Sequence, residues 1–165
     1  MIAVSHLFQG RAIRGLTLIE MMITLTIIAI LAAVGGPSIN GMMQNRTADA
    51  LRDHLEMDIA FARSQAVVLA NTVNVQPLSG DWNIGWQVLQ GATLLRTRGS
   101  NSQHTAAANT ISSTFTTSAP LSFDSQGRAS TGSLLIAVTN CKGEHRHTIN
   151  INFIGQTVIT SGACP

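Results

Sequence analysis

The stretch RGLTLIEMMITLTIIAI runs from Arg14 to Ile30. It opens a segment that contains no charged residue from Met21 to Asn45. About 20 mostly apolar residues are enough to cross the hydrocarbon core of a bilayer as a helix. The segment therefore predicts a transmembrane helix over about residues 18–40. Arg11 and Arg14 precede it, and this bias predicts a cytoplasmic N-terminus with the rest of the chain on the other side.

Glu20 is a charged residue at the edge of this apolar segment. A carboxylate costs about 2.5–3.5 kcal/mol at the centre of a membrane helix on insertion scales, and less near the interface. Glu20 either lies in the headgroup layer without a role or pairs with a cation. If the bond after Gly15 is cleaved, Leu16 gains a free α-amino group that lies four residues before Glu20, or beside Glu20 of a neighbouring chain.

Residues 46–70 have the periodicity of an amphipathic helix. Apolar residues recur at intervals of three and four, which places them on one helical face; they are Leu51, Leu55, Ile59, Ala62, Ala66 and Leu69. No strong stop signal lies between Ser38 and Asn71. The pattern predicts one long helix over residues 16–70, with a bend at Pro37 because proline cannot complete the helical hydrogen-bond ladder.

The remaining residues, 71–165, are typical of a β-rich domain. Short runs rich in β-branched and aromatic residues are separated by turn signals and predict strands; the runs are Thr72–Val75, Gly85–Leu89, Leu121–Phe123, Ser133–Thr139, Thr148–Phe153 and Thr157–Thr160. The Ser/Thr-rich stretch between Arg98 and Ala119 predicts a surface loop or an irregular edge. The fold class is therefore α+β.

The composition argues against catalysis and against a strong nucleic-acid binder. A chain of 165 residues allows one domain, or one domain with an anchor. Charged residues make up 11% of it, and Arg11 and Arg14 equal its whole net charge of +2, so no basic stripe is expected. The sequence contains no Gly-x-Ser-x-Gly elbow and no phosphate-binding Gly-Lys-Ser/Thr loop. We predict that the protein is not an enzyme and uses no cofactor.

Gly15-Leu16-Thr17-Leu18-Ile19-Glu20, with the apolar run behind it, resembles the class III signal of type IV pilins and pseudopilins. The resemblance implies that prepilin peptidase cuts after Gly15, removes residues 1–15 and methylates the amine of Leu16. It also implies that Glu20 serves filament assembly and that Pro37 bends the helix. Leu16 departs from the pattern, since phenylalanine is more usual there. The amine of one chain would then pair with Glu20 of another, because two charges in an apolar interior are tolerated only when paired.

Later blocks resemble the GspH/FimT group of minor pilins and pseudopilins; they are FARSQAVVLAN (61–71), DWNIGWQV (81–88), LSFDSQGRAS (121–130) and INFIGQTVITSGACP (151–165). The resemblance implies a long helix on a small antiparallel β-sandwich, and a subunit that initiates or caps a type IV pilus-like filament. It implies a single-pass inner-membrane protein with a periplasmic domain. Its partners would be other minor and major pilins or pseudopilins, prepilin peptidase, the inner-membrane assembly platform and the lipid bilayer. A minor pseudopilin H of type II secretion is the alternative.

Two cysteines, Cys141 and Cys164, allow one pairing. Disulfides persist in the periplasm, so a bridge that holds the last strand is expected. Two buried free thiols are the alternative.

Two further groups of residues could form a metal-binding or ligand-binding site. His145 and His147 would share one face of a strand, but a third histidine, His54 or His104, is distant in sequence, and a structural zinc site normally takes four ligands. We therefore predict a polar strand end and no metal. Trp82 and Trp86 favour core packing around a turn over a ligand platform.

DNA binding is an alternative of another class. Some members of this group bind DNA in natural transformation through a Gly-Arg-x-Arg motif near the C-terminus. The matching place, Gly155-Gln156-Thr157-Val158, lacks both arginines, and each missing cation removes a phosphate contact. Dispersed cations would have to replace them; they are Arg96, Arg98, Arg128, Lys142 and Arg146.

Overall fold

The computed structural model describes residues 17–99 and 110–165, with the side chains of residues 33–39 excepted. The chain divides into two compact units, Met1–Pro37 and Ser38–Pro165. Gly15, Leu16 and the predicted leader 1–15 lie outside the described residues. The side chain of Pro37 does so as well, and the bend there stays a prediction.

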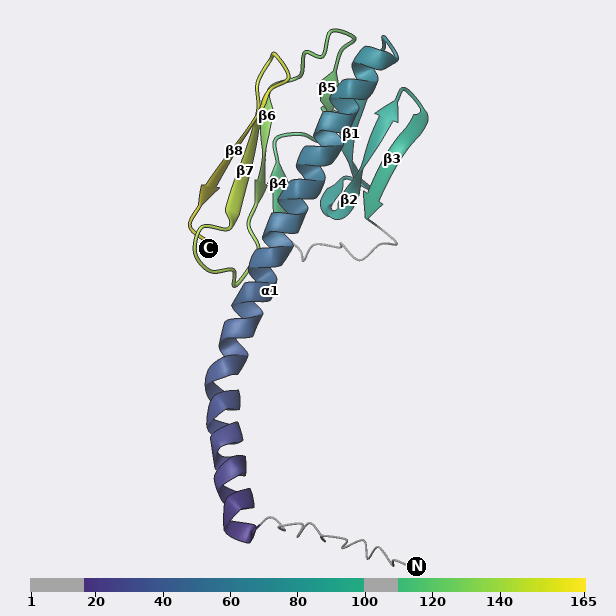
Figure 1. Ribbon diagram of the computed structural model, residues 1–165. Coiled ribbons are helices and arrows are strands. Elements are labelled where there is room, and N and C mark those ends of the chain that lie inside the picture. The colour runs from purple at the N-terminus through teal and green to yellow at the C-terminus, as the bar shows by residue number, and fades with distance from the viewer. Residues whose placement is uncertain (1–16, 100–109) are drawn as a thin grey trace, which may run out of the picture. The chain divides into compact units, whose positions relative to one another are not determined.

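Helix α1 spans Leu18–Val68 (Figure 1). It begins with a reciprocal cap between Thr17 and Glu20. The amide of Glu20 donates a hydrogen bond to Thr17 Oγ1 at 3.2 Å, and the amide of Thr17 donates a long one to Glu20 Oε2 at 3.5 Å. This is the capping box, in which two amides that lack helical partners are satisfied by side chains. Glu20 therefore stabilises the helix start in addition to the assembly role that we predict for it.

The first part of α1 exposes apolar side chains on all sides. Their exposed fractions run from 49% at Met21 to 80% at Leu18; the set is Leu18, Ile19, Met21, Met22, Ile23, Leu25, Ile27, Ile28, Ile30 and Leu31. The hydroxyls of Thr24 and Thr26 donate to the carbonyls of Met21 and Met22 at 3.0 and 2.7 Å.

In the part of the chain that the structure describes, no helix offers a stretch that is both long enough and apolar enough to cross a membrane.

The C-terminal end of α1 is closed by a left-handed residue. Ala70 has a φ of 48°, the amide of Asn71 donates to Ala66 O at 3.1 Å, and the amide of Ala70 donates to Val67 O at 3.3 Å. This is the Schellman pattern, with alanine at the position where glycine is usual. The helix consequently ends two residues before the predicted boundary.

Two four-stranded antiparallel sheets complete the second unit. The first has the order β3-β2-β1-β5 and the second has the order β4-β6-β7-β8. Their strands are β1 Val73–Leu78, β2 Asp81–Gln90, β3 Thr93–Gly99, β4 Ile111–Ser113, β5 Leu121–Phe123, β6 Gly132–Ile136, β7 Arg146–Ile151 and β8 Thr157–Gly162. Figure 1 shows the part of α1 after Ser38 lying across both sheets. The predicted α+β fold with a long helix on a small antiparallel sandwich is confirmed.

The core lies between this part of α1 and the inner faces of the sheets. Five of the six predicted helix residues are at most 3% exposed, and they are Leu51, Leu55, Ile59, Ala62 and Ala66. The sixth, Leu69, is 39% exposed because it follows the last helical residue. Trp82 and Trp86 are buried, as the core-packing interpretation predicted. Trp82 Nε1 donates to Phe115 O at 2.9 Å, which satisfies the only donor of its side chain.

Two strands differ from the sequence-based prediction. No strand was predicted for β3, whose residues Arg96 and Arg98 turn toward the helix where apolar residues would be expected. Strand β4 lies inside the stretch that was predicted to be a loop or irregular edge, and it pairs with β6. Residues 100–109 of that stretch lie outside the described residues.

Gly85 and Gly99 face each other across β2 and β3. Each has a positive φ, 140° and 109°, and a Cβ on either would collide with backbone atoms of the other strand. This close approach explains glycine at both positions.

Cys141 and Cys164 form a disulfide with a Cα–Cα distance of 5.6 Å, which confirms the predicted pairing. The bridge joins residues 23 apart, and the amide of Cys164 also donates to Gly143 O at 2.9 Å. It thus holds the end of the chain beyond β8 against the β6–β7 connection.

Replacing both cysteines by serine is expected to lower the free energy of unfolding by about 2–4 kcal/mol, because the unfolded chain is no longer cross-linked. Urea unfolding of the full chain in detergent, oxidised and reduced, measures this. The reductant should destabilise the native chain and leave the double variant unchanged. Equal stability of the oxidised native chain and the double variant would contradict the prediction.

Candidate functional site

Asp58 is the most deeply buried charged residue among the described residues. Its side chain is 1% exposed, and it lies on the apolar face of α1, three residues after Leu55 and four before Ala62. Trp86 Nε1 of β2 donates to Asp58 Oδ2 at 2.9 Å. Arg96 Nη1 donates to Oδ1 at 2.8 Å and Arg98 Nε donates to Oδ2 at 2.7 Å, both from β3.

Arg96 and Arg98 compensate the charge of the Asp58 carboxylate, which is too deeply buried for water to solvate it. Burial by itself would raise the pKa of Asp58, but the hydrogen bonds from Arg98, Arg96 and Trp86 outweigh it and hold the pKa below its usual value. The Arg96 guanidinium also lies over the Phe61 ring, 3.8 Å from its centroid. This cluster fastens the helix to the first sheet. Sequence reasoning missed it, although a charge within an apolar helical face is a signal that a partner exists.

The five cations proposed as DNA contacts do not gather in one place. The guanidiniums of Arg96 and Arg98 are brought together, but on Asp58. Arg128 forms an ion pair with Asp124 at 2.7 Å. Desolvation by itself would raise the pKa of Asp124, but hydrogen bonds from the backbone and side chain of Arg128 and from the backbone of Gln126 hold it below its usual value. Lys142 belongs to the β6–β7 connection, and its amide donates to Asn45 Oδ1. Arg146 is the first residue of β7.

Arg63 clamps two turns of the sheets to α1. Its Nε donates to Gly127 O and its Nη2 to Ile154 O, each at 3.0 Å. Beside it lies a groove of about 670 Å³, lined by Ile59, Ala60, Arg63, Ser64, Val67, Val68, Gln126, Gly127, Gly155, Gln156 and Thr157. Among the described residues that line it, Arg63 alone is charged, and they include no acid–base pair or nucleophile–base pair.

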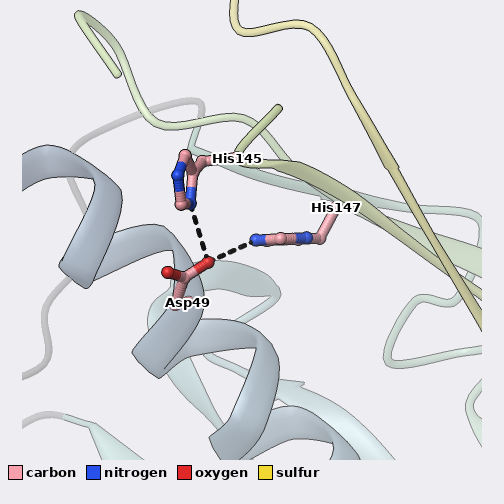
Figure 2. A group of neighbouring side chains, drawn as sticks. All are labelled: Asp49, His145 and His147. Carbon is pink, nitrogen blue, oxygen red and sulfur yellow. Dashed lines mark hydrogen bonds and ion pairs between the residues drawn. The ribbon is translucent and has the colours of Figure 1, made fainter. Parts of the chain in front are cut away.

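A third cluster joins α1 to the second sheet. Figure 2 shows His145 and His147 pointing at the same carboxylate oxygen of Asp49. The distances from Asp49 Oδ1 are 3.0 Å to His145 Nδ1 and 2.8 Å to His147 Nε2. His147 Nδ1 lies 3.0 Å from Ser161 Oγ of β8. Burial would raise the pKa of Asp49, but the hydrogen bonds from the two imidazoles and their charge keep it below its usual value.

The predicted neighbourhood of His145 and His147 is present, but the third residue is not the one considered. His54 is not in the cluster, and His104 lies outside the described residues. The third residue is Asp49, 96 positions before His145. The signal available in the sequence was only that Asp49 follows core residue Ala48 at the edge of the apolar face.

The model of the family described as "Type II transport protein GspH" matches residues 52–155. The chain belongs to the GspH family. A second family model, the prokaryotic N-terminal methylation motif, matches residues 10–36. Members of the GspH family are minor pilins and pseudopilins, and this chain is one of that type. No curated protein matches the chain.

Two crystal structures of one minor pilin share the fold of this GspH-family chain, and a minor pseudopilin is also similar to it. The type IV minor pilin FimU of Pseudomonas aeruginosa is 19% identical with a TM-score of 0.55, over 75% of this chain and 99% of FimU. A second crystal form of FimU gives a TM-score of 0.51 over 71% of this chain and 99% of FimU. The minor pseudopilin EpsH of Vibrio cholerae is 13% identical with a TM-score of 0.48, over 69% of this chain and 96% of EpsH. The comparisons give no support to the DNA-binding alternative.

Proposed function

We propose that this GspH-family chain is a minor subunit that initiates or caps a type IV pilus-like filament. In this proposal prepilin peptidase cleaves it between Gly15 and Leu16, α1 anchors it in the inner membrane and residues 71–165 lie in the periplasm. The observation that carries the proposal is the joint match of the methylation motif over residues 10–36 and the GspH family over residues 52–155. The chain thus has a pilin signal and a minor-pilin domain in the expected order.

The exposed side chains of α1 support an apolar environment for its first part. Soluble monomers rarely expose a contiguous apolar patch of more than a few hundred Å², whereas Leu18 to Leu31 offers apolar side chains around the helix. Thr24 and Thr26 satisfy their hydroxyls on carbonyls of the same helix. This is what a lipid or filament interior requires, because water is not there to bond them. The absence of charge from Met21 to Asn45 agrees with the same environment.

The Cys141–Cys164 disulfide supports the proposed location of the domain. Disulfides are rare in the cytosol and persist in the periplasm. The partners that follow from the proposal are other minor and major pilins or pseudopilins, prepilin peptidase and the inner-membrane assembly platform. The machine is either a type IV pilus or a type II secretion system, and the likeness to FimU concerns the fold. A cluster of minor-pilin genes beside this one would favour the pilus, and secretin and secretion-ATPase genes would favour secretion.

The processing step tests the proposal. We expect Gly15→Val to abolish cleavage, because the peptidase takes the bond after glycine, so the purified chain should keep residues 1–15. The mass of the N-terminal peptide from membrane fractions measures this. The matched control is Leu16→Phe, which restores the more usual residue and should be processed like the native chain.

Filament formation is the second readout. The Gly15→Val chain should remain in the membrane fraction and fail to restore pili or secretion in a strain that lacks the gene, whereas Leu16→Phe should restore them. A native chain that is never cleaved at Gly15 in its host, or a deletion strain with normal filaments and normal secretion, would refute the proposed function.

A further inference from the structure

The Asp49–His145–His147 cluster has more in common with a metal site than with an ordinary ion pair. Three potential ligand atoms, one carboxylate oxygen and two imidazole nitrogens, lie within 4.8 Å of one another. Both rings direct a nitrogen at the same oxygen from different sides, with an angle of 87° between the ring planes (Figure 2). The three potential ligand atoms converge on one place, although they come from three separate elements, which are α1, the β6–β7 connection and β7.

The distances are close to those that a metal ion requires. Zn²⁺ binds imidazole nitrogen and carboxylate oxygen at about 2.0–2.2 Å, so tetrahedral ligand atoms lie roughly 3.3 Å apart. The two distances to Asp49 Oδ1 are 3.0 and 2.8 Å. The two ring nitrogens lie within 4.8 Å of each other and must also adopt that spacing. The side chains of Asp49 and His145 are 37% and 33% exposed and have room to adjust. Their exposure also leaves the remaining coordination positions open to water.

His147 is held in the orientation that a ligand needs. Its side chain is 4% exposed, and its second ring nitrogen, Nδ1, lies 3.0 Å from Ser161 Oγ. When an ion takes the place of the hydrogen that Nε2 shares with Asp49, a hydrogen on Nδ1 that is donated to Ser161 leaves the lone pair of Nε2 directed at that ion. Metal-binding histidines almost always donate their other ring hydrogen to such a partner, which sets the tautomer and the ring orientation. Ser161 therefore has the position of a residue that orients a ligand.

The donor set selects the class of metal. Imidazole suits Zn²⁺, Cu²⁺, Ni²⁺ and Fe²⁺, whereas Ca²⁺ and Mg²⁺ prefer sites made entirely of oxygen. We propose that Asp49, His145 and His147 bind a divalent transition-metal ion, Zn²⁺ in particular, with Ser161 orienting His147. This replaces the metal-free strand end that the two histidines alone predict, because Asp49 supplies a third ligand atom. The bound ion ties α1 to the start of β7 and keeps open coordination positions at the surface. This inference does not depend on the proposed place of the chain in a filament.

The test uses the full chain, purified in detergent through a tag without histidine and stripped with a chelator. Titration with Co²⁺, followed by its visible absorption bands, and competition by Zn²⁺ report binding and coordination. We expect one ion per chain, displacement of Co²⁺ by Zn²⁺ and no displacement by Ca²⁺. Zn²⁺ should also raise the unfolding temperature, because an ion that binds only the folded chain stabilises it.

Variants separate this site from other histidines. We expect His145→Ala to weaken Zn²⁺ binding at least about tenfold and to reduce the thermal shift accordingly, and Ser161→Ala to weaken binding about 10–100-fold. His145 is the preferred ligand variant because its ring is less buried than that of His147, 33% against 4% exposed, and its removal should affect folding less. His147→Gln is the second variant.

The matched control is His54→Ala, which removes one histidine from α1, the helix that carries Asp49. His54 lies five residues after Asp49 and so about 140° around the helix axis, and its loss should leave Zn²⁺ affinity unchanged. A native chain without saturable Co²⁺ or Zn²⁺ binding would overturn the proposal and leave a hydrogen-bonded cluster only. Native affinity retained in both His145→Ala and His147→Gln would also overturn it, because the ion would then be held elsewhere.

Discussion

Replacing Asp58 by alanine is expected to lower the free energy of unfolding by about 3 kcal/mol. Removing one partner of a buried ion pair costs about 3–5 kcal/mol, because the remaining charges lose their compensation. The lower end applies here because the side chains of Arg96 and Arg98 are 35% and 23% exposed and can turn to water. The Trp86 indole is 1% exposed, so its hydrogen would be left without an acceptor.

Denaturant unfolding of the full chain in detergent, followed by tryptophan fluorescence, measures this change. The matched control is Asp53→Ala, which removes an exposed carboxylate from the same helix together with its contact to Arg52. Exposed ion pairs contribute about 0–1 kcal/mol, so the control should stay close to the native chain. A loss of less than about 1 kcal/mol in Asp58→Ala would show that the cluster does not hold the helix to the sheet.

The same cluster predicts the sign of a pH dependence. The pKa of Asp58 is lower in the folded chain than in the unfolded chain, where a free aspartate titrates near about 3.9. The stability that its charge contributes is therefore complete above that unfolded value and is lost as the pH falls through the lower folded value. Asp58→Asn lacks this contribution. The stability difference between the native chain and Asp58→Asn should consequently shrink in acid below about pH 4.

Local periodicity explains why the helix could be predicted from the sequence. The apolar residues Leu51, Leu55, Ile59 and Ala62 repeat at helical spacing, and the sheets bury them on one side of α1. The C-terminal boundary of α1 is harder to predict from the sequence. It depends on a left-handed Ala70, a position where glycine would have been a recognisable signal.

The elements that were missed depend on contacts between distant residues. In strand β3, Arg96 and Arg98 point inward. Their burial is explained by Asp58, which lies opposite them on α1. The Asp49–His145 contact joins residues 96 positions apart, so no local pattern could have revealed it. Long-range polar contacts leave little trace in hydrophobic periodicity, because they replace the apolar residues from which that periodicity is built.

Glu20 raises a question that sequence and structure answer differently, and one pair of variants separates the answers. The structure shows a capping carboxylate that bonds the Thr17 amide, whereas the pilin resemblance predicts a charge that pairs with the Leu16 amine of another subunit. Glutamine can occupy the same place in a capping box but carries no charge. Glu20→Gln therefore keeps the cap and removes the charge, and Glu20→Ala removes both.

We expect both variants to insert and to be cleaved like the native chain, and both to lower filament number or secretion at least about tenfold. An unpaired amine in an apolar interior costs several kcal/mol, and about 1.4 kcal/mol corresponds to a factor of ten. Filament counts or secreted protein, in a strain that lacks the native gene, measure the effect. Asp53→Ala serves as the control for loss of a carboxylate elsewhere on α1. If Glu20→Gln assembles normally while Glu20→Ala does not, the cap accounts for Glu20, and charge pairing between subunits does not.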